Sequence, residues 1–226
     1  MIGSAFSERE AGIVKENART SVMGDGMETL RYGQVELDHL KERDAALGAV
    51  IDRIGMIECD IVPDPFVALV NSIVCQQLSG KAADTVWNRM MERFGDITPH
   101  SMAAAPLEDL RACGLSQRKA EYVRGIAKAV DTGEMDIAAL PGLPDEEVIM
   151  KLSSLRGVGV WTAEMLLIFS MGRMDVVSYG DLAIRRGMIK LYGLEELDRE
   201  TFEMYRKRYS PYGTVASLYL WRVAHE

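Results

Sequence analysis

The sequence is poor in the residues that mark several common classes of protein. Its three cysteines lie far apart, at Cys59, Cys75 and Cys113, and no two of them form a CxxC pair. This spacing excludes a disulfide scaffold and a cysteine-based metal site, so we expect reduced thiols. No apolar run approaches the roughly 20 residues that cross a bilayer, so we expect no membrane association and a cytoplasmic location.

Basic residues are also in the minority. Lys and Arg number 26 against 34 Asp and Glu, and the resulting net charge of −8 argues, taken alone, against a nucleic-acid partner. The charge is unevenly distributed, however. Residues 151–192 contain six basic and three acidic residues, a net charge of +3. Because a local basic surface is sufficient to contact a few phosphates, the total charge does not exclude DNA binding.

Apolar residues recur at helical spacing through most of the chain, and no segment shows the sustained alternation of a strand. Capping residues and prolines divide the pattern into about ten helices, of which the first covers 35–55 and the last covers 211–225. The predicted fold class is therefore all-α, without a sheet. Residues 1–34 have weak periodicity, and we interpret them as a loose arm.

Two loops divide this helical chain. The segment Leu140–Pro144 contains two prolines and a glycine, and a second boundary falls near 59–64. We therefore predict a middle helical domain, residues 65–144. Residues 1–64 plus 145–226 would come together as one discontinuous helical domain.

A glycine turn, Gly157–Val158–Gly159, joins two of the predicted helices. Glycine permits a positive φ and lets the backbone approach another surface closely. The N–H groups of such a turn, and those that open the next helix, point toward an anion such as a phosphate. Alone, the turn is better explained as an ordinary corner between helices.

Asp181 precedes an amphipathic helix, so its simplest role is that of an N-cap, which contributes about 1 kcal/mol. The N-terminus of a helix also favours the charged form of a carboxyl group. An ionised carboxylate in a sheltered cleft is what a reaction through a sugar cation requires.

In combination these features are more specific. LRGVGVWTA, followed by Asp181 in YGDLAIRRG, resembles the helix-hairpin-helix DNA glycosylase superfamily. Three further segments are similar, in the same order, to its alkylated-base branch, the 3-methyladenine DNA glycosylases. They are FVALVNSIVCQQLSGKAADTVWNRM (66–90), GLSQRKAEYVRGIA (114–127) and SPYGTVASLYLWR (210–222). The resemblance is to the compact, all-helical form, in which the hairpin motif lies at the cleft between two helical subdomains.

The resemblance implies a monofunctional enzyme that excises alkylated purines, of the 3-methyladenine and 7-methylguanine class, by hydrolysis of the N-glycosidic bond in base excision repair. The target nucleotide would be flipped out of the duplex first. Bifunctional relatives carry a lysine where this chain has Trp161, so no lyase step is expected. Relatives with an iron–sulfur cluster end in four closely spaced cysteines, which are absent here. No cofactor is therefore expected, apart from a structural monovalent cation on the carbonyl groups of Ser153, Leu155 and Val158.

The resemblance also assigns roles to individual side chains. Asp181 would be the catalytic residue, which stabilises the sugar cation or orients the water. Trp161 would stack on the flipped base, and Gln77 or Leu78 would insert into the duplex as a wedge that holds the gap open. The substrate-binding residues would be Trp161, Tyr179, Tyr212 and Met165, and the DNA-binding residues would be Gly157, Val158, Gly159, Thr162, Gln77 and Leu78. Each has a plainer alternative, such as core packing for Trp161 and Met165.

The expected partner is double-stranded DNA with alkylated bases, bound by a monomer in the nucleoid of a prokaryote or the nucleus of a eukaryote. Two other classes of function stay open. A non-catalytic helix-hairpin-helix DNA-binding module needs the glycines but no carboxylate at Asp181. A helical adaptor for other proteins is favoured by the net charge of −8 and disfavoured by the glycine hairpin.

Overall fold

The structure, a computed structural model, describes residues 28–226. In that range it contains twelve α-helices, one short 3-10 helix and a single pair of two-residue strands, which confirms the all-α prediction. The helices are α2 (Gln34–Arg43), α3 (Ala45–Ile54), α4 (Pro65–Cys75), α5 (Gly80–Phe94), α6 (Pro99–Ala104), α7 (Leu107–Ala112), α8 (Gln117–Asp131), η1 (Leu140–Gly142), α9 (Asp145–Ser153), α10 (Val160–Phe169), α11 (Leu182–Tyr192), α12 (Arg199–Tyr209) and α13 (Gly213–His225). The loose arm predicted for residues 1–34 lies mostly outside the described residues.

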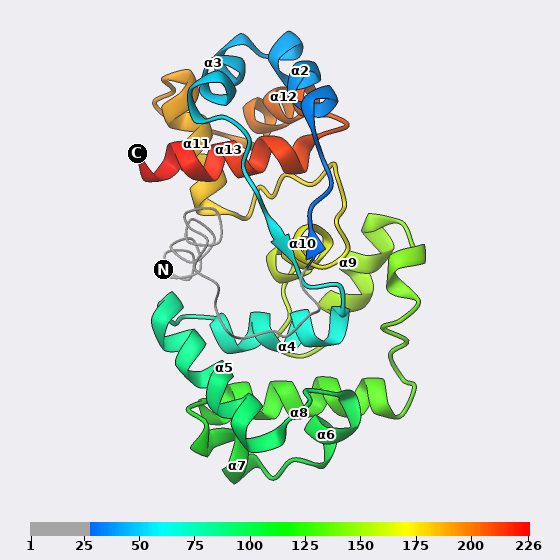
Figure 1. Cartoon of the computed structure of the whole chain (residues 1–226). Coiled ribbons are helices and arrows are strands. Elements are labelled where there is room, and N and C mark those ends of the chain that lie inside the picture. Colours follow the sequence, from blue (N-terminus) through cyan, green and yellow to red (C-terminus); the bar gives the residue numbers. More distant parts are fainter. Residues whose placement is uncertain (1–27) are drawn as a thin grey trace.

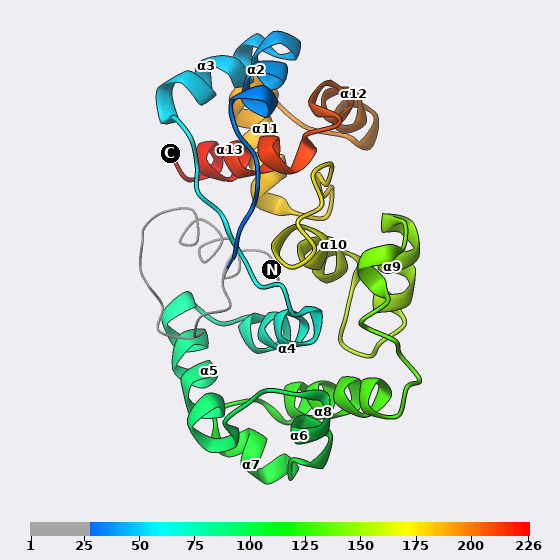
Figure 2. The same cartoon turned by 45° about the vertical axis from the view of Figure 1, so that its right-hand side comes forward.

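The helices form two groups at opposite ends of an elongated molecule. Helices α2, α3, α11, α12 and α13 lie at one end, and α5, α6, α7 and α8 lie at the other (Figure 1). Helices α4, α9 and α10 lie between the groups, as the turned view in Figure 2 also shows. Helix α4 contacts both α8 and α10, so it connects the group formed by α5, α6, α7 and α8 to the middle of the molecule. The division into domains 65–144 and 1–64 plus 145–226 stays a prediction.

The prediction that the chain has no sheet is wrong in one detail. Strand β1 (Glu28–Thr29) pairs in an antiparallel manner with β2 (Asp60–Ile61), and Leu30 N donates to Cys59 O at 2.8 Å. Each strand has two residues, which is too short to produce an alternating pattern in the sequence. The pairing also joins segments that are distant in the chain, which no local pattern reveals.

The single helix expected over 35–55 is also wrong, because the chain breaks at Asp44. This residue has extended backbone angles, φ −147° and ψ 103°, and its Oδ1 accepts a hydrogen bond from Leu47 N at 2.9 Å. Its Oδ2 accepts from the hydroxyl of Tyr192 at 2.9 Å and from Arg208 at 3.2 Å. A buried carboxylate with partners on α11 and α12 thus ends one helix and begins the next.

Buried hydroxyl groups of α13 fix the segment that leads from α10 to α11. Thr214 Oγ1 accepts from Val176 N at 3.0 Å and donates to Arg173 O at 2.6 Å. Ser217 Oγ donates to Val176 O at 3.0 Å, and both hydroxyl-bearing residues are fully buried. Because Asp181 follows five residues after Val176, these bonds determine where the next helix begins.

The helices α11 and α13 approach each other closely at Gly187. A Cβ atom on this residue would lie 2.2 Å from the carbonyl oxygen of Leu220, so no larger residue fits. The close crossing holds α11, and the carboxylate at its start, against the C-terminal helix. Among residues 28–226, no helix combines the length and apolar character needed to cross a membrane.

Candidate active site

Gly157 is required by the fold of the hairpin itself. Its φ is +97°, in the region that disfavours residues with a side chain. A Cβ atom here would also lie 2.4 Å from the ring of Tyr122 on α8. Both the backbone angle and the close packing against Tyr122 therefore demand glycine at this position.

Gly159 has a different status. Its φ of −100° and ψ of 170° are extended, and any residue can adopt them. No described atom outside its immediate neighbours lies within 4 Å of the position that its Cβ would occupy. Glycine is a suitable N-cap residue for α10, but no contact within the described part of the chain requires it here, and the open space leaves room for an external molecule to approach closely.

The N-terminus of α10 opens onto this space beside Gly159. The first hydrogen bond within the helix runs from Ala163 N to Gly159 O at 3.0 Å, so the preceding amide groups point out of the helix end. Val158 and Thr162 are buried, with exposed fractions of 6% and 5%. Their side chains belong to the fold, and a contact of this turn with phosphate would use backbone groups.

Asp181 begins α11 with both oxygens of its carboxylate engaged. Oδ1 accepts from Ala183 N at 2.7 Å and from Ile184 N at 2.9 Å, which is the expected capping arrangement. Oδ2 accepts from the indole Nε1 of Trp161 at 3.0 Å. The side chain is 3% exposed, so its charge is held in a fixed direction in a sheltered site.

The bond between Trp161 and Asp181 joins α10 directly to the start of α11. Trp161 is half-buried, and a Cβ atom on Gly180 would lie 3.7 Å from its Cβ and 4.0 Å from its ring. The structure thus brings together the residue predicted to stack on the base and the residue predicted to face the sugar. The stacking and catalytic roles of these residues stay predictions.

Glu164 is a second carboxylate that the sequence analysis missed. It lies one turn after Trp161 on α10, and its Oε2 accepts a hydrogen bond from the buried hydroxyl of Ser178. Burial raises the pKa of Glu164 above its ordinary value, and the nearby charge of Asp181 acts in the same direction. The Ser178 bond and the positive charge of Arg199 oppose that rise. The sequence does contain a signal that points to this residue, because Glu164 is the one charged residue in the otherwise uncharged helix VWTAEMLLIF.

Tyr179 lies among cationic side chains. The guanidinium carbons of Arg185 and Arg199 lie 4.9 and 4.7 Å from the centre of its ring. Its ring and that of Phe202 on α12 form an edge-to-face pair, with the two ring centroids 5.0 Å apart. Cation–π contacts of this kind hold the ring in place. They also place two positive charges close to the start of α11.

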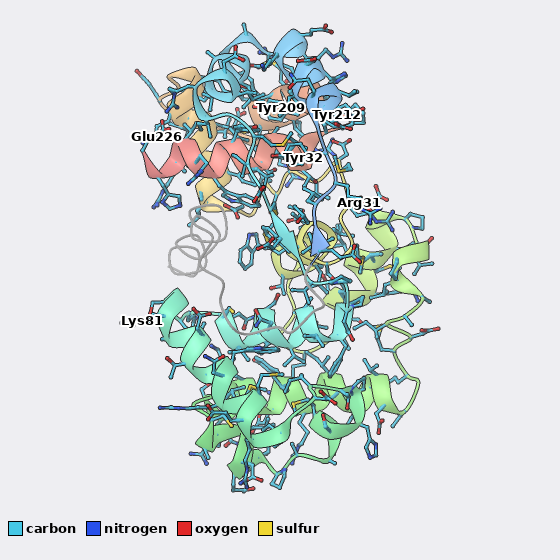
Figure 3. The ribbon with its side chains drawn as sticks, in the orientation of Figure 1. Arg31, Tyr32, Lys81, Tyr209, Tyr212 and Glu226 are labelled. Carbon is cyan, nitrogen blue, oxygen red and sulfur yellow. The ribbon has the colours of Figure 1, made fainter. Side chains whose placement is uncertain are left out.

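The two remaining residues predicted to line the pocket have other surroundings. Tyr212 makes an edge contact with His39 of α2 at 5.1 Å, and in Figure 3 it lies at the end of the molecule formed by α2, α12 and α13. Met165 is 2% exposed and packs in the core. The structure therefore groups Trp161 and Asp181 with Glu164, whereas the ring contact of Tyr212 is with His39.

The predicted wedge residues differ from each other. Gln77 is exposed and has a φ of +57°, whereas Leu78 is half-buried and packs against the core. The preceding residue, Gln76, donates from Nε2 to Gly157 O at 3.1 Å. This bond brings the C-terminal turn of α4 next to the hairpin, so the two predicted DNA-contacting segments lie side by side.

The oxygen donors that the resemblance assigns to a monovalent cation fit such an ion. They are hard carbonyl donors at the end of α9 and in the turn that follows it, and the buried Ser153 Oγ has no hydrogen-bond partner. Leu155 O accepts from Val158 N at 3.1 Å, which closes the turn. Among the described residues, no group of three or more His, Cys, Asp and Glu could hold a metal ion.

The hairpin that opens α10 and the carboxylate that caps α11 both lie within a region that matches a known family of DNA repair proteins. The model of the HhH-GPD superfamily of base excision DNA repair proteins matches residues 70–211, more than half of the chain, and the chain belongs to this superfamily.

The relatives specify the branch. The chain is 34% identical over 166 residues to DNA-3-methyladenine glycosylase 1 of Schizosaccharomyces pombe, covering 71% of this chain and 73% of that protein. Its fold matches a crystal structure of DNA-3-methyladenine glycosidase from Bacillus halodurans with a TM-score of 0.74 and 37% identity, over 87% of this chain and 92% of the other. It also matches the S. pombe 3-methyladenine DNA glycosylase in complex with abasic DNA, with a TM-score of 0.74 and 31% identity, over 84% and 96%. The resemblance to the alkylated-base branch is thereby confirmed.

Proposed function

We propose that the protein hydrolyses the N-glycosidic bond of alkylated purines in duplex DNA, with Asp181 as the catalytic residue. The observation that carries this proposal is the fixed position of the Asp181 carboxylate. Two backbone amides and the Trp161 indole hold it at the start of α11, beside the hairpin. The names of the relatives, DNA-3-methyladenine glycosylases, support the substrate class.

DNA binding begins at the hairpin in this proposal. The open space at Gly159 accepts the phosphodiester backbone, and the amide groups at the start of α10 donate to a phosphate. A cation held by the carbonyl groups of Ser153, Leu155 and Val158 would add positive charge at the same place. The abasic DNA bound by the related S. pombe enzyme supports DNA as the partner.

The flipped base then stacks on Trp161. A purine methylated at a ring nitrogen is cationic and leaves readily, so the enzyme needs little acid catalysis on the base. The indole face attracts such a cation. The hydrogen bond to Asp181 orients that indole, so a base that stacks on Trp161 has its sugar next to Asp181.

As the glycosidic bond breaks, positive charge develops on the sugar. Oδ1 of Asp181 accepts from two amides of α11, whereas Oδ2 accepts from the Trp161 indole alone, so we assign Oδ2 to the sugar. Its charge is oriented before the substrate arrives, which is the arrangement that stabilises a transition state most effectively. Water completes the hydrolysis. Because Trp161 replaces the lysine of bifunctional relatives, no Schiff base forms at this position.

Incubation with methylated duplex DNA tests the proposal directly. The protein should release 3-methyladenine and 7-methylguanine, identified by chromatography, and should leave intact abasic strands. Asp181→Asn should lose this release while it retains binding to undamaged duplex. Normal release by Asp181→Asn would overturn the catalytic assignment, and binding without any release by the wild type would favour a non-catalytic DNA-binding module.

We further propose that the protein acts as a monomer. Each functional residue in this scheme comes from one chain. Its place of action would be wherever the genomic DNA lies, in the nucleoid or the nucleus.

A further inference from the structure

The chain makes an unusual turn directly after α4. Leu78 N donates to Cys75 O at 3.1 Å, which closes a four-residue turn. Gln76 has a φ of −50° and a ψ of 127°, and Gln77 has a φ of +57°. These are the angles of a type II turn, whose third residue is normally glycine or asparagine because its φ is positive. Gln77 is the one residue other than glycine with a positive φ among residues 28–226.

Such a conformation persists only where the surroundings impose it. A type I turn would let Gln77 adopt an ordinary φ, and it differs from type II by a flip of the peptide group between the two central residues. The flip would reverse the direction of the Gln76 carbonyl group. A hydrogen bond to that carbonyl therefore selects one turn type over the other.

Lys119 of α8 makes this hydrogen bond. Its Nζ donates to the carbonyl oxygen of Gln76, and also to Val74 O at 2.9 Å, near the end of α4. Lys119 is half-buried, and burial lowers the pKa of its ammonium group. A cation at the C-terminal end of a helix compensates exposed carbonyl groups, and here it also fixes the flipped peptide.

The opposite side of the turn is fixed to the hairpin. The Gln76 side chain donates to Gly157 O at 3.1 Å, and Tyr122, one turn after Lys119 on α8, packs against Gly157. Helix α8 therefore supports both the turn that carries Gln77 and the hairpin. The exposed Gln77 side chain is held at a fixed position relative to the phosphate-binding turn.

We propose that Lys119 is a positioning residue that holds the Gln76–Gln77 peptide in its flipped orientation and so directs Gln77 into the gap left by a flipped base. This inference rests on the proposed function, because it assigns Gln77 rather than Leu78 as the inserted side chain. A wedge is needed only when the lesion lies in a duplex, since a single strand has no opposite stack to hold open.

The functional test compares excision from methylated duplex DNA with excision from methylated single-stranded DNA. Lys119→Met should lower the duplex rate at least tenfold relative to the single-strand rate. Lys128→Met, on an exposed lysine of the same helix, is the matched control and should change neither rate. Gln77→Asn in the Lys119→Met background should recover part of the duplex rate, because asparagine adopts a positive φ more readily. Equal loss on both substrates, without recovery, would overturn the inference.

A stability measurement tests the turn independently of any activity. With Lys119 present, Gln77→Gly relieves the unfavourable φ, whereas in Lys119→Met the turn is already released. The effect of Gln77→Gly on the unfolding equilibrium in urea should therefore be more favourable with Lys119 than with Met at that position, by roughly five- to thirty-fold. Additive effects would overturn the positioning role. If the wild type released no base from either DNA, the proposed function would fail, and this cycle would still decide whether Lys119 holds the turn.

Discussion

The hydrogen bond between Trp161 and Asp181 leads to a sharp prediction for Asp181→Asn. Asparagine retains one acceptor oxygen, which can keep the two amide bonds that cap α11. Its amide nitrogen then stands where Oδ2 accepted from the indole at 3.0 Å, so two donors face each other. Turning the amide restores the indole bond but removes the cap.

Either outcome costs free energy. Leaving a buried donor without an acceptor costs about 1–3 kcal/mol, and losing a cap costs about 1 kcal/mol. We therefore expect the free energy of unfolding of Asp181→Asn to fall by about 1–3 kcal/mol. For a chain of this size, each kcal/mol lowers the Tm by roughly 2–4 °C, so the Tm should fall by about 2–12 °C.

The assay is a double-mutant cycle in urea at neutral pH with Trp161→Phe, which removes the indole donor. In that background Asp181→Asn should cost at least about 1 kcal/mol less than in the wild type. Asp198→Asn is the matched control, because this exposed carboxylate also caps its helix, at 2.8 Å from Thr201 N, but has no buried partner. Its stability should change little.

The rate of base excision should distinguish Asp181→Asn from Trp161→Phe. Asp181→Asn should lose about 10²–10⁴-fold in rate, the usual effect of removing a group that stabilises developing charge or transfers a proton. Trp161→Phe retains an aromatic face and should lose less. Additive stabilities of Asp181→Asn and Trp161→Phe would show that the indole bond contributes nothing, and equal rates for wild type and Asp181→Asn would refute its catalytic role.

Three further predictions address neighbouring features. Gly159→Asn, which keeps a good N-cap, should retain stability and lose at least about tenfold in DNA affinity, as measured by gel shift. Gly157→Ala should be destabilised by more than about 2 kcal/mol, as measured by unfolding in urea. Because burial raises the pKa of Glu164, the wild type loses stability as pH rises above the ordinary glutamate pKa, and Glu164→Gln should gain stability relative to it over that rise. A constant difference in urea titrations would contradict this. Borohydride trapping should give no covalent protein–DNA adduct, since Trp161 has no amine, and a strong adduct would reveal a lyase step.

Local signals explain what could be predicted from the sequence. The caps and prolines located most helices, and the glycine hairpin and Asp181 lie where the motifs indicated. These features depend on residues close together in the chain, such as Asp181 and the two amides that it caps. Propensity and motif spacing record such short-range interactions well.

Long-range partners explain what could not be predicted. The break at Asp44 combines a local cap on Leu47 N with bonds from Tyr192 and Arg208, more than 140 residues away, and the periodicity of 35–55 does not reveal these distant partners. The bonds from Lys119 to the end of α4 likewise cross 43 and 45 residues of sequence. Local pattern contains no information on contacts of this kind, which tertiary packing alone creates.

Through the hydroxyl groups of Thr214 and Ser217, helix α13 influences the position of Asp181, which lies at the start of another helix. These hydroxyl groups anchor the segment that leads to α11 through Arg173 and Val176, so a defect in α13 would displace Asp181, the proposed catalytic residue. Impaired repair in a natural variant therefore need not signify damage at the DNA surface. A conservative change such as Thr214→Val, deep inside the protein, should be enough to produce an enzyme that binds damaged DNA and repairs it slowly.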